Sequence, residues 1–561
     1  MSPPAHDTSA HLAGWRLYII IACLYFGAFL IALDTNIINV ALPRISSDFA
    51  SLQDVAWYGS AYLLFITALQ PVYGSVYKYF PTDVVYRLSI LIFEVGSIIC
   101  AAAVNSSMFI AGRAVAGFGA AGVLQGALSI ISQVVPLEKR PLYMGIVISV
   151  FVVTVTIGPV LGGAFVQNST WRWCFWINVP IGAVVLVGLT MFLKVRGAPN
   201  KDRTLPFRTK IRNMDPLGCF VFLGAVCCLL LALQWGGQTK PWSSADVIGC
   251  LVGAFLIASL FVYWQWRRGD VALIPLRVLK KRSIWTGAMA LFFFGAQTYV
   301  ITFFLPFWFQ AVKGLSPVDT GVDFIPLLLS QMIALVVVGA VVKQFGSYVP
   351  YMVVGELIGI GGQAMLTQIH SGSTTLYWAA GLVVTGLGTG MAMQLPYTAV
   401  AIVLADEDIP VGNAIAVLFY QLGGAVSISM GQTITITTLL DLVERRLPGL
   451  SPRMVITAGA ANLPALAPTP DALDVLRGNW NTAIARTMIL ATVLLGAAVP
   501  FTLGMEWLNA VRVAEQRVAE QRKAAEAAQE KDKGPPASTE GDAPEAVADK
   551  EEGKAPLSCA V

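Results

Sequence analysis

The sequence predicts an all-α membrane protein, a bundle of about fourteen transmembrane helices. Two features of composition favour this class: 56% of the 561 residues are hydrophobic and only 12% are charged, whereas soluble domains carry about 25% charged residues. The third observation is the repetition of apolar runs of roughly the 20 residues needed to cross hydrocarbon. We expect spans at 15–41, 54–76, 86–104, 108–134, 142–165, 174–193, 216–236, 246–265, 284–308, 321–343, 350–369, 376–402, 412–438 and 482–505.

The basic residues predict the orientation of the chain. Lys and Arg gather in alternate loops, above all at Lys139–Arg140, at 194–212 and at 267–282, and the intervening loops carry mostly single bases. An excess of Lys and Arg marks the cytoplasmic side, so we expect both termini in the cytoplasm and an even number of spans. The loop 405–410 is an exception, because it holds three acids and no base. We expect a multi-pass protein of the plasma membrane.

Two sequence motifs occur twice and indicate an internal duplication. Gly74-x-Val76-x-Lys78 matches Gly339-x-Val341-x-Lys343, and Gly117-x-Gly119 with Gln125 matches Gly386-x-Gly388 with Gln394. Parallel repeats with a substrate site between them are a known transporter arrangement. Chance matching of small residues in apolar spans is the alternative.

The duplication and the loop pattern predict the domain organisation. We expect a cytoplasmic segment at 1–14, a first six-span half at 15–194, a cytoplasmic linker with spans seven and eight at 195–283, a second six-span half at 284–505 with an outer loop at 441–481, and a largely disordered cytoplasmic tail at 506–561. The tail is rich in Pro, Glu, Ala and Lys, which cannot bury a core.

Asp34 is the main candidate for proton coupling, because it interrupts the first apolar run. An acid at the bilayer centre costs about 2.5–3.5 kcal/mol on insertion scales, so it should face a protein interior or a wet cavity. The alternative is a polar group that hydrogen-bonds a neighbouring span. Arg113 and Glu94 are the next candidates: Arg113 stays charged and requires an anion, and it could serve equally in a structural pair, while Glu94 could pair with a base or titrate.

Small residues in the fifth predicted span are candidates for gating. Gly158, Pro159, Gly162 and Gly163 combine close-packing positions with a proline that removes a backbone donor and bends the helix. A bent helix could seal one side of a cavity, although simple tight packing needs the same residues. Gly74 and Gly339, from the repeated motif, are further gating candidates.

Aromatic and amide side chains inside the spans are candidates for substrate binding. Sites for small organic ligands are mostly apolar with a few placed polar groups. Any one of these side chains could instead be a packing residue or an interface aromatic. The candidates are Trp57, Tyr62, Gln125, Gln297, Tyr299, Gln394, Tyr397, Tyr420 and Gln421.

The motifs resemble those of a known family. Leu33-Asp34-Thr35 through Pro43, Arg113 with Gly117-x-Gly119, and Gly158-Pro159-x-x-Gly162-Gly163 are similar to signature motifs of the major facilitator superfamily, in its fourteen-span drug:proton antiporter branch. The resemblance extends to fungal toxin and secondary-metabolite efflux pumps. It implies a major-facilitator-type bundle of two pseudo-symmetric six-helix halves plus two extra helices. It also implies export by antiport, with Arg113 tied to proton transfer. One departure is Lys78, which stands where the family usually has an acid.

The sequence therefore predicts a secondary active exporter that exchanges a hydrophobic small molecule for protons by alternating access. The three histidines lie outside the deep parts of the spans and no phosphate-binding loop is present, so we expect no enzyme, cofactor or metal site. A net charge of +4 argues against a nucleic-acid partner, and we expect a monomer. An importer or facilitator on the same fold, or a transporter-like sensor, remains the alternative.

Two N-glycosylation sequons fall on predicted outer loops. They are Asn105-Ser-Ser and Asn168-Ser-Thr. Glycosylation at Asn105 and Asn168 would agree with the predicted orientation.

Overall fold

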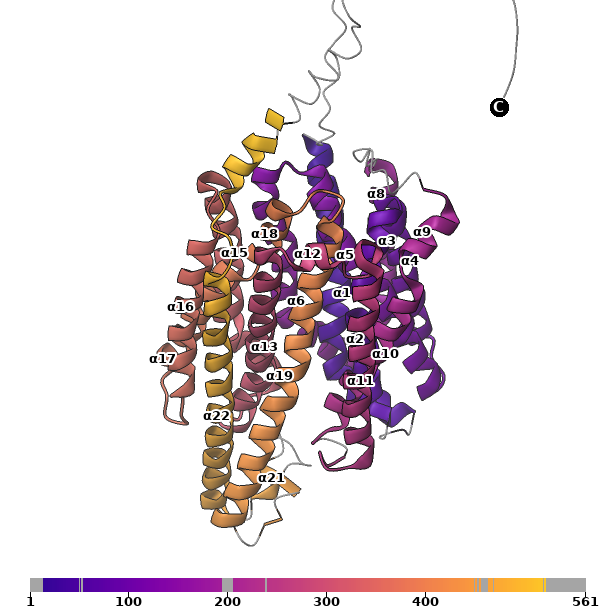
Figure 1. Ribbon diagram of the computed structural model, residues 1–561. Helices are drawn as coiled ribbons and strands as arrows, with labels where there is room; N and C mark the ends of the chain where they lie inside the picture. Colours follow the sequence, from indigo (N-terminus) through magenta and orange to yellow (C-terminus); the bar gives the residue numbers. More distant parts are fainter. Residues whose placement is uncertain are drawn as a thin grey trace, which may run out of the picture. The chain divides into compact units, whose positions relative to one another are not determined.

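The fold is all-helical in a computed structural model of the chain (Figure 1). The structure describes residues 14–49, 51, 54–193, 205–237, 240–447, 450–451, 454–455, 463–467, 469–517 and 519–520. The first group of helices is α1 (Trp15–Asp48), α2 (Val55–Ala68), α3 (Gln70–Tyr79), α4 (Thr82–Ala101), α5 (Ser106–Val134), α6 (Arg140–Asn168), α7 (Trp173–Trp176) and α8 (Asn178–Phe192).

Four helices connect the first group to the last. They are α9 (Phe207–Asn213), α10 (Pro216–Trp235), α11 (Ala245–Arg268) and α12 (Leu276–Leu279). The last group is α13 (Arg282–Ala311), α14 (Pro317–Asp323), α15 (Ile325–Phe345), α16 (Val349–Thr367), α17 (Thr375–Ala392), α18 (Leu395–Val403), α19 (Ile409–Arg446), α21 (Leu463–Leu466) and α22 (Pro470–Leu503). Residues 515–561 form a separate unit. Of the predicted tail at 506–561, the structure describes 506–517 and 519–520, and the rest lies outside the described residues.

Among the described residues, twelve helices are long and apolar enough to cross a membrane, or up to thirteen if one bent pair counts as a single span. The bent pair is Leu137–Val155 with Val160–Asn168, at 44°. Gly158 and Pro159 lie in that bend, as expected of a helix that loses a backbone donor at proline. The predicted span 54–76 falls instead on α2 and α3, which are interrupted at Leu69 and have 14 and 10 residues. The predicted count of fourteen is therefore not reached.

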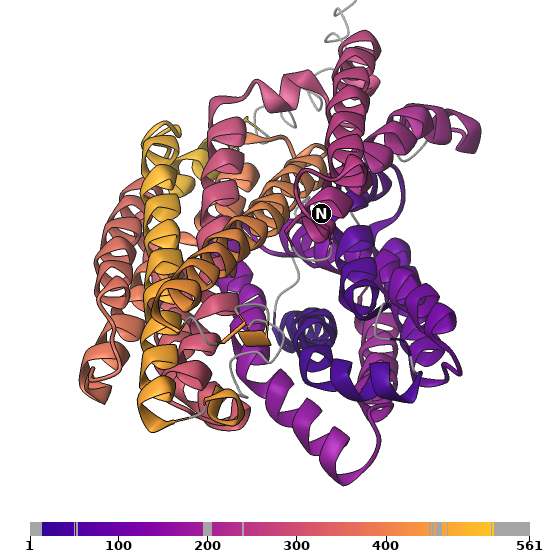
Figure 2. The same cartoon turned by 90° about the horizontal axis from the view of Figure 1, so that it is seen from below.

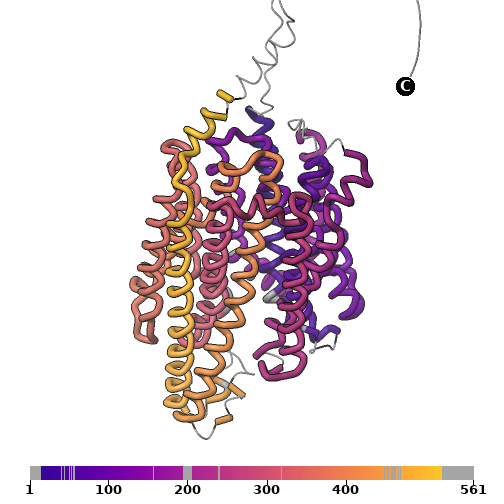
Figure 3. The backbone as a smooth tube through the Cα atoms, viewed as in Figure 1, coloured from indigo at the N-terminus to yellow at the C-terminus, as the bar shows by residue number. Residues whose placement is uncertain are grey.

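The long helices run in a common direction, with most helices of the first group on one side and those of the last group on the other (Figures 1 and 3). The exception is α6, which contacts both α1 and α15. Seen along the helices, α19 lies between the two groups (Figure 2), and it contacts α3 and α5 as well as α13. We call the end of the bundle where α1 begins and α22 ends the terminal face. The opposite end carries α21 and the connections around it.

Glycine contacts repeat between the two groups of helices. Gly119 of α5 lies against the backbone of Phe93 in α4, and Gly388 of α17 lies against the backbone of Gly359 in α16. Three residues along each helix the contact recurs, between Gly96 and Ala116 and between Gly362 and Thr385. At each of these four glycines an added Cβ would overlap the backbone of the facing helix. The α4–α5 pair and the α16–α17 pair therefore pack in the same way.

A buried carboxylate fixes the connecting helices α9 to α11. Asp215, at a φ of 55°, precedes α10 and is 1% exposed. Its oxygens accept hydrogen bonds from Trp264 Nε1 at 2.8 Å, Gln265 Nε2 at 2.9 Å and the backbone N–H of Gly218 at 3.1 Å. Arg268 lies 3.6 Å away. The carboxylate thus ties the end of α11 to the start of α10.

We expect Asp215→Ala to lower the stability of the protein by about 2–4 kcal/mol, because several buried donors lose their acceptor at once. Thermal unfolding of the purified protein in detergent measures the loss. Asp246→Ala is the matched control, because the Lys240–Asp246 pair is solvent-exposed and such pairs contribute about 0–1 kcal/mol. Equal melting temperatures for the two variants would contradict the stabilising role of the Asp215 carboxylate.

Candidate transport site

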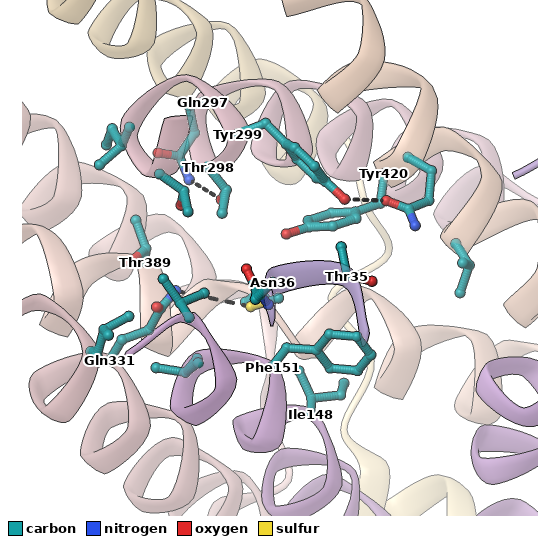
Figure 4. A pocket seen from close by; sticks show the side chains of 18 of the residues that line it. Thr35, Asn36, Ile148, Phe151, Gln297, Thr298, Tyr299, Gln331, Thr389 and Tyr420 are labelled. Carbon is teal, nitrogen blue, oxygen red and sulfur yellow. Dashed lines mark hydrogen bonds between the residues drawn. The ribbon is translucent and has the colours of Figure 1, made fainter. Parts of the chain in front are cut away.

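A cavity of about 200 Å³ lies between the two groups of helices (Figure 4). Helices α1, α2, α5 and α6 line it from one group, and α13, α15, α17, α18 and α19 line it from the other. Among the lining residues that the structure describes, none is Asp, Glu, Lys, Arg or His. A concave, mostly apolar space with a few polar groups is the usual form of a site for a small organic molecule.

The two walls of the cavity differ in polarity. Helices α2, α5 and α6 contribute apolar side chains, which are Leu63, Ile66, Leu124, Leu128, Ile148, Phe151, Val152 and Val155. Most polar lining groups come from the last group of helices, and they are Gln297, Thr298, Tyr299, Thr302, Gln331, Thr385, Thr389, Tyr397, Tyr420 and Gln421. The first group adds only Thr35 and Asn36 of α1 to these polar groups.

Hydrogen bonds orient several groups of the polar wall. Tyr299 donates its hydroxyl to Gln421 Oε1 at 2.6 Å, which joins α13 to α19. Gln363 Nε2 donates to Gln297 Oε1 at 2.6 Å, and Gln297 Nε2 donates to Thr298 at 2.7 Å. The rings of Tyr299 and Tyr420 lie 6.0 Å apart (Figure 4). These contacts hold amide and phenol groups in fixed positions around the cavity.

Five of the predicted binding residues line the cavity, namely Gln297, Tyr299, Tyr397, Tyr420 and Gln421. The other four lie elsewhere. Tyr62 packs under the Arg113 guanidinium, with 4.3 Å from Cζ to the ring centroid, and Trp57 lines a separate hollow between α2 and α5. Gln125 donates to the carbonyl of Pro410. Gln394 donates to the carbonyl of Leu335 at 2.8 Å.

Sequence reasoning missed several cavity residues, above all Thr35, Asn36 and Gln331. Each is a polar side chain within an apolar run, and intramembrane polar groups usually face the interior of a bundle. That signal was present in the sequence. Periodicity alone could not tell which face of α1 or α15 meets the cavity, because both helices are apolar on all sides.

Asp34 and Arg113 form a buried ion pair behind the cavity wall. Arg113 Nη1 lies 2.5 Å from Asp34 Oδ2, and the two side chains are 1% and 0% exposed. Arg113 Nε also donates to the backbone carbonyl of Tyr58 at 2.8 Å. The anion that Arg113 requires is thus Asp34, and the pair links α1, α2 and α5.

Asp34 adjoins the cavity through its neighbours in α1. Consecutive helical residues point about 100° apart, so Asp34 faces Arg113 while Thr35 and Asn36 line the cavity. Asn36 Nδ2 donates to the carbonyl of Ala32 at 2.7 Å and lies 3.5 Å from Thr154 Oγ1 of α6. One turn of α1 therefore carries both the ion pair and part of the cavity wall.

Glu94 of α4 lies close to this pair. It is 6% exposed, and neither carboxylate oxygen has a hydrogen-bond partner within the described part of the chain. It packs against Gly182 of α8. Among the described residues no base forms an ion pair with it, in contrast to Asp34.

The predicted gating glycines lie at close helix contacts. A Cβ on Gly158 would stand 2.7 Å from Asn36 Cβ, and one on Gly162 would stand 2.8 Å from the carbonyl oxygen of Ile37. Gly163 is buried beside them, and Pro159 follows Gly158 in the bend of α6. The bend therefore meets α1 directly beyond Asp34.

Gly74 and Gly339 lie at contacts between the two groups of helices. A Cβ on Gly74 of α3 would stand 2.8 Å from Ala414 Cβ and 3.2 Å from the Pro410 carbonyl of α19. A Cβ on Gly339 of α15 would stand 2.9 Å from the Pro141 carbonyl of α6. Both contacts are at the terminal-face ends of their helices.

A charge cluster reinforces the α3–α19 contact. Asp408, before α19, accepts from Lys78 of α3 at 3.2 Å and from Arg277 of α12 at 2.6 and 2.9 Å. The Lys78 and Asp408 side chains are 7% and 4% exposed. Arg140 of α6 lies 3.8 Å from Asp406 in the same loop. The loop without bases thus pairs with bases from other elements, and Lys78 has a partner of opposite charge.

Both sequon asparagines are solvent-exposed, one at the start of α5 and the other at the end of α6. Asn105 caps α5, because its Oδ1 accepts from the backbone N–H of Met108 at 2.8 Å. Asn168 ends α6. Glycosylation of either one stays a prediction.

Sequence comparison shows the family of this chain. The protein-family model described as "Major Facilitator Superfamily" matches residues 24–428. The chain belongs to the major facilitator superfamily. It is a transporter by family and not an enzyme.

Curated members of the superfamily are similar over most of the chain. The "MFS-type efflux pump MFS1" of Arthroderma benhamiae is 39% identical over 502 residues, 90% of this chain and 93% of that protein. The "Efflux pump aflT" of Aspergillus parasiticus is 37% identical over 504 residues, 90% and 98% of the two chains. The "Aspyridones efflux protein" of Neocamarosporium betae is 37% identical over 511 residues, 91% and 90% of the two chains.

Solved structures of the same fold include the human organic anion transporter MFSD10, with a TM-score of 0.55 and 14% identity over 86% of this chain and all of that one. A bacterial homolog of the lysosomal transporter Spinster, in an inward-facing and occupied conformation, has a TM-score of 0.53 and 14% identity over 88% and 97% of the two chains. These likenesses show the fold alone. The expected superfamily membership is confirmed by the family match and the curated relatives.

Proposed function

We propose that this member of the superfamily exports a hydrophobic secondary metabolite or toxin in exchange for protons. The observation that carries the proposal is the geometry of α1, which holds a buried Asp34–Arg113 pair on one face and cavity residues on another. Similar proteins named as efflux pumps, one of them for aspyridones, support an exported metabolite. Protons and substrate would then occupy separate sites that share one helix.

Coupling would proceed through the charge of Asp34. A proton on Asp34 neutralises the carboxylate and removes most of the attraction to Arg113. The turn of α1 that carries Thr35 and Asn36 is then free to shift against the Gly158–Gly162 surface of α6. Glu94, which is buried nearby and has no hydrogen-bond partner among the described residues, is a second place for the proton.

Alternating access would use the contacts at the terminal face. The Lys78–Asp408–Arg277 cluster and the Gly74 and Gly339 contacts hold elements of the two groups of helices together at that face, and in our proposal they close that side of the cavity. Opening requires them to separate, so we assign them to the cytoplasmic gate. The repeated glycine packing of α4–α5 and α16–α17 supports two related halves that move against each other.

We further infer fourteen crossings, if α2 with α3 makes one interrupted span and the bent α6 another. An even count leaves both termini on one side, and the distribution of Lys and Arg makes that side cytoplasmic. We propose that the protein acts as a monomer in the plasma membrane.

Efflux from loaded cells tests this function. Yeast cells producing the full chain are preloaded with Nile red, which is neutral, rhodamine 6G, a cation, or fluorescein, an anion. We expect at least one probe to leave about five times faster than from cells without the protein, and a protonophore to abolish the difference. Efflux that persists in the protonophore, or net uptake of the probe, would contradict proton-coupled export and favour a facilitator or importer.

A further inference from the structure

The cavity has a chemical character that the proposed function does not specify. Its lining, in the part of the chain that the structure describes, holds amides, hydroxyls and phenols but no ionisable acid or base apart from the phenols. The nearest carboxylate in sequence, Asp34, is 0% exposed and paired with Arg113. A charged molecule in this cavity would therefore find no counter-ion.

We propose that the substrate is an uncharged amphipathic molecule with an apolar body and hydrogen-bonding groups on the side that faces the last group of helices. This inference rests on the proposed function, because it describes what the exported molecule must be. Moving a charge from water into an uncompensated apolar space is strongly unfavourable. Organic cations and organic anions of similar size are therefore excluded.

The asymmetry of the walls orients the molecule. Phe151 and its apolar neighbours on α5 and α6 receive the body. The polar side faces the last group of helices, where Tyr299 and Gln421 are already paired with each other. The polar lining groups of that wall come from five helices, α13, α15, α17, α18 and α19. A polar group of the substrate that faced the apolar wall of α2, α5 and α6 would be left unsatisfied.

Gln331 is the specificity-determining residue that this geometry singles out. Its Nε2 has only the sulfur of Met393 as a partner among the described residues, at 4.0 Å, and thioether sulfur is a weak acceptor. The side chain lies across the cavity from Tyr420, beside Asn36 and Thr389 (Figure 4). The Gln331 amide can therefore donate and accept hydrogen bonds with a neutral substrate group such as a ketone, lactone, amide or hydroxyl group.

The three probes used above test the class of substrate. We expect Nile red to leave cells about ten times faster than rhodamine 6G or fluorescein, in a protonophore-sensitive way. Faster protonophore-sensitive efflux of the cation or the anion would overturn the substrate class while leaving the proposed function standing. Efflux of none of the three would overturn both.

A charge placed in the cavity tests the reason for the selectivity. Gln331→Glu should raise the ratio of rhodamine 6G to Nile red efflux about tenfold, because the carboxylate supplies the missing counter-ion. Gln368→Glu is the matched control, since Gln368 is exposed and does not line the cavity, and its ratio should equal that of the wild type. Gln421→Glu makes the same test if Gln331→Glu fails to reach the membrane. An unchanged ratio in the cavity variants would refute the proposal.

Discussion

Asp34→Asn is expected to reduce protonophore-sensitive efflux about 100-fold. The loss is large because Asp34 carries the proton through the transport cycle and does not act only in substrate binding. The amide keeps the shape of the side chain and can still accept from Arg113, but it cannot carry a proton. Efflux rate per molecule of protein at the cell surface is the quantity to compare. Asp83→Asn is the matched control, because Asp83 forms a partly exposed pair with Arg87 at the start of α4.

Stability must be separated from coupling in this experiment. Removing one member of a buried ion pair leaves the other charge uncompensated and can cost about 3–5 kcal/mol. The double variant Asp34→Asn with Arg113→Gln removes both charges, and we expect it to fold and remain inactive. Protonophore-sensitive efflux in either variant would remove Asp34 from the coupling role.

Asp408→Asn is expected to open the terminal face. Lys78 and Arg277 would then share a site without their carboxylate, and Lys78 is almost fully buried there. Loss of one partner from such a cluster can shift an equilibrium by about 3–5 kcal/mol. The population should therefore move toward the state in which α3 and α19 have separated.

Thiol labelling measures this shift. Leu128→Cys, placed on the cavity wall of a chain otherwise without cysteine, is exposed to a membrane-impermeant maleimide from the terminal side of inside-out vesicles. We expect labelling about ten times faster with Asp408→Asn than without it. Asp406→Asn is the control, because the Asp406 side chain is 61% exposed and its arginine lies 3.8 Å away. Equal rates in all three chains would show that the cluster does not hold the gate.

The sequence predicted the features that depend on residues close together in the chain or on the chemistry of a single side chain. A proline after Gly158 predicts a bend, and a bend of 44° is present there. An intramembrane arginine requires an anion, and Asp34 fills that role. Span lengths follow from apolar runs, although the interruption at Leu69 was not foreseen in spite of Pro71 just after it.

Other features depend on contacts between distant segments. Lys78 and Asp408 are 330 residues apart, so neither the acids of the 405–410 loop nor the unusual base in α3 could be matched from sequence. Gln125 and Gln394 are polar amides within apolar spans, as the cavity residues are. The side chain of each, however, donates a hydrogen bond to a backbone carbonyl of another segment. Such choices depend on which helix faces which, and apolar membrane helices carry little amphipathic signal to decide it.

Proton movement evoked by substrate is the most direct measurement of the central claim that one turn of α1 couples two separate sites. Nile red is added to proteoliposomes that contain the full chain and a trapped pH-sensitive dye, with no gradient imposed. Wild-type protein should move protons in the direction opposite to the Nile red. With the Asp34→Asn protein, addition of Nile red should cause no change of internal pH. Nile red transport by the wild type without any accompanying change of internal pH would contradict the account.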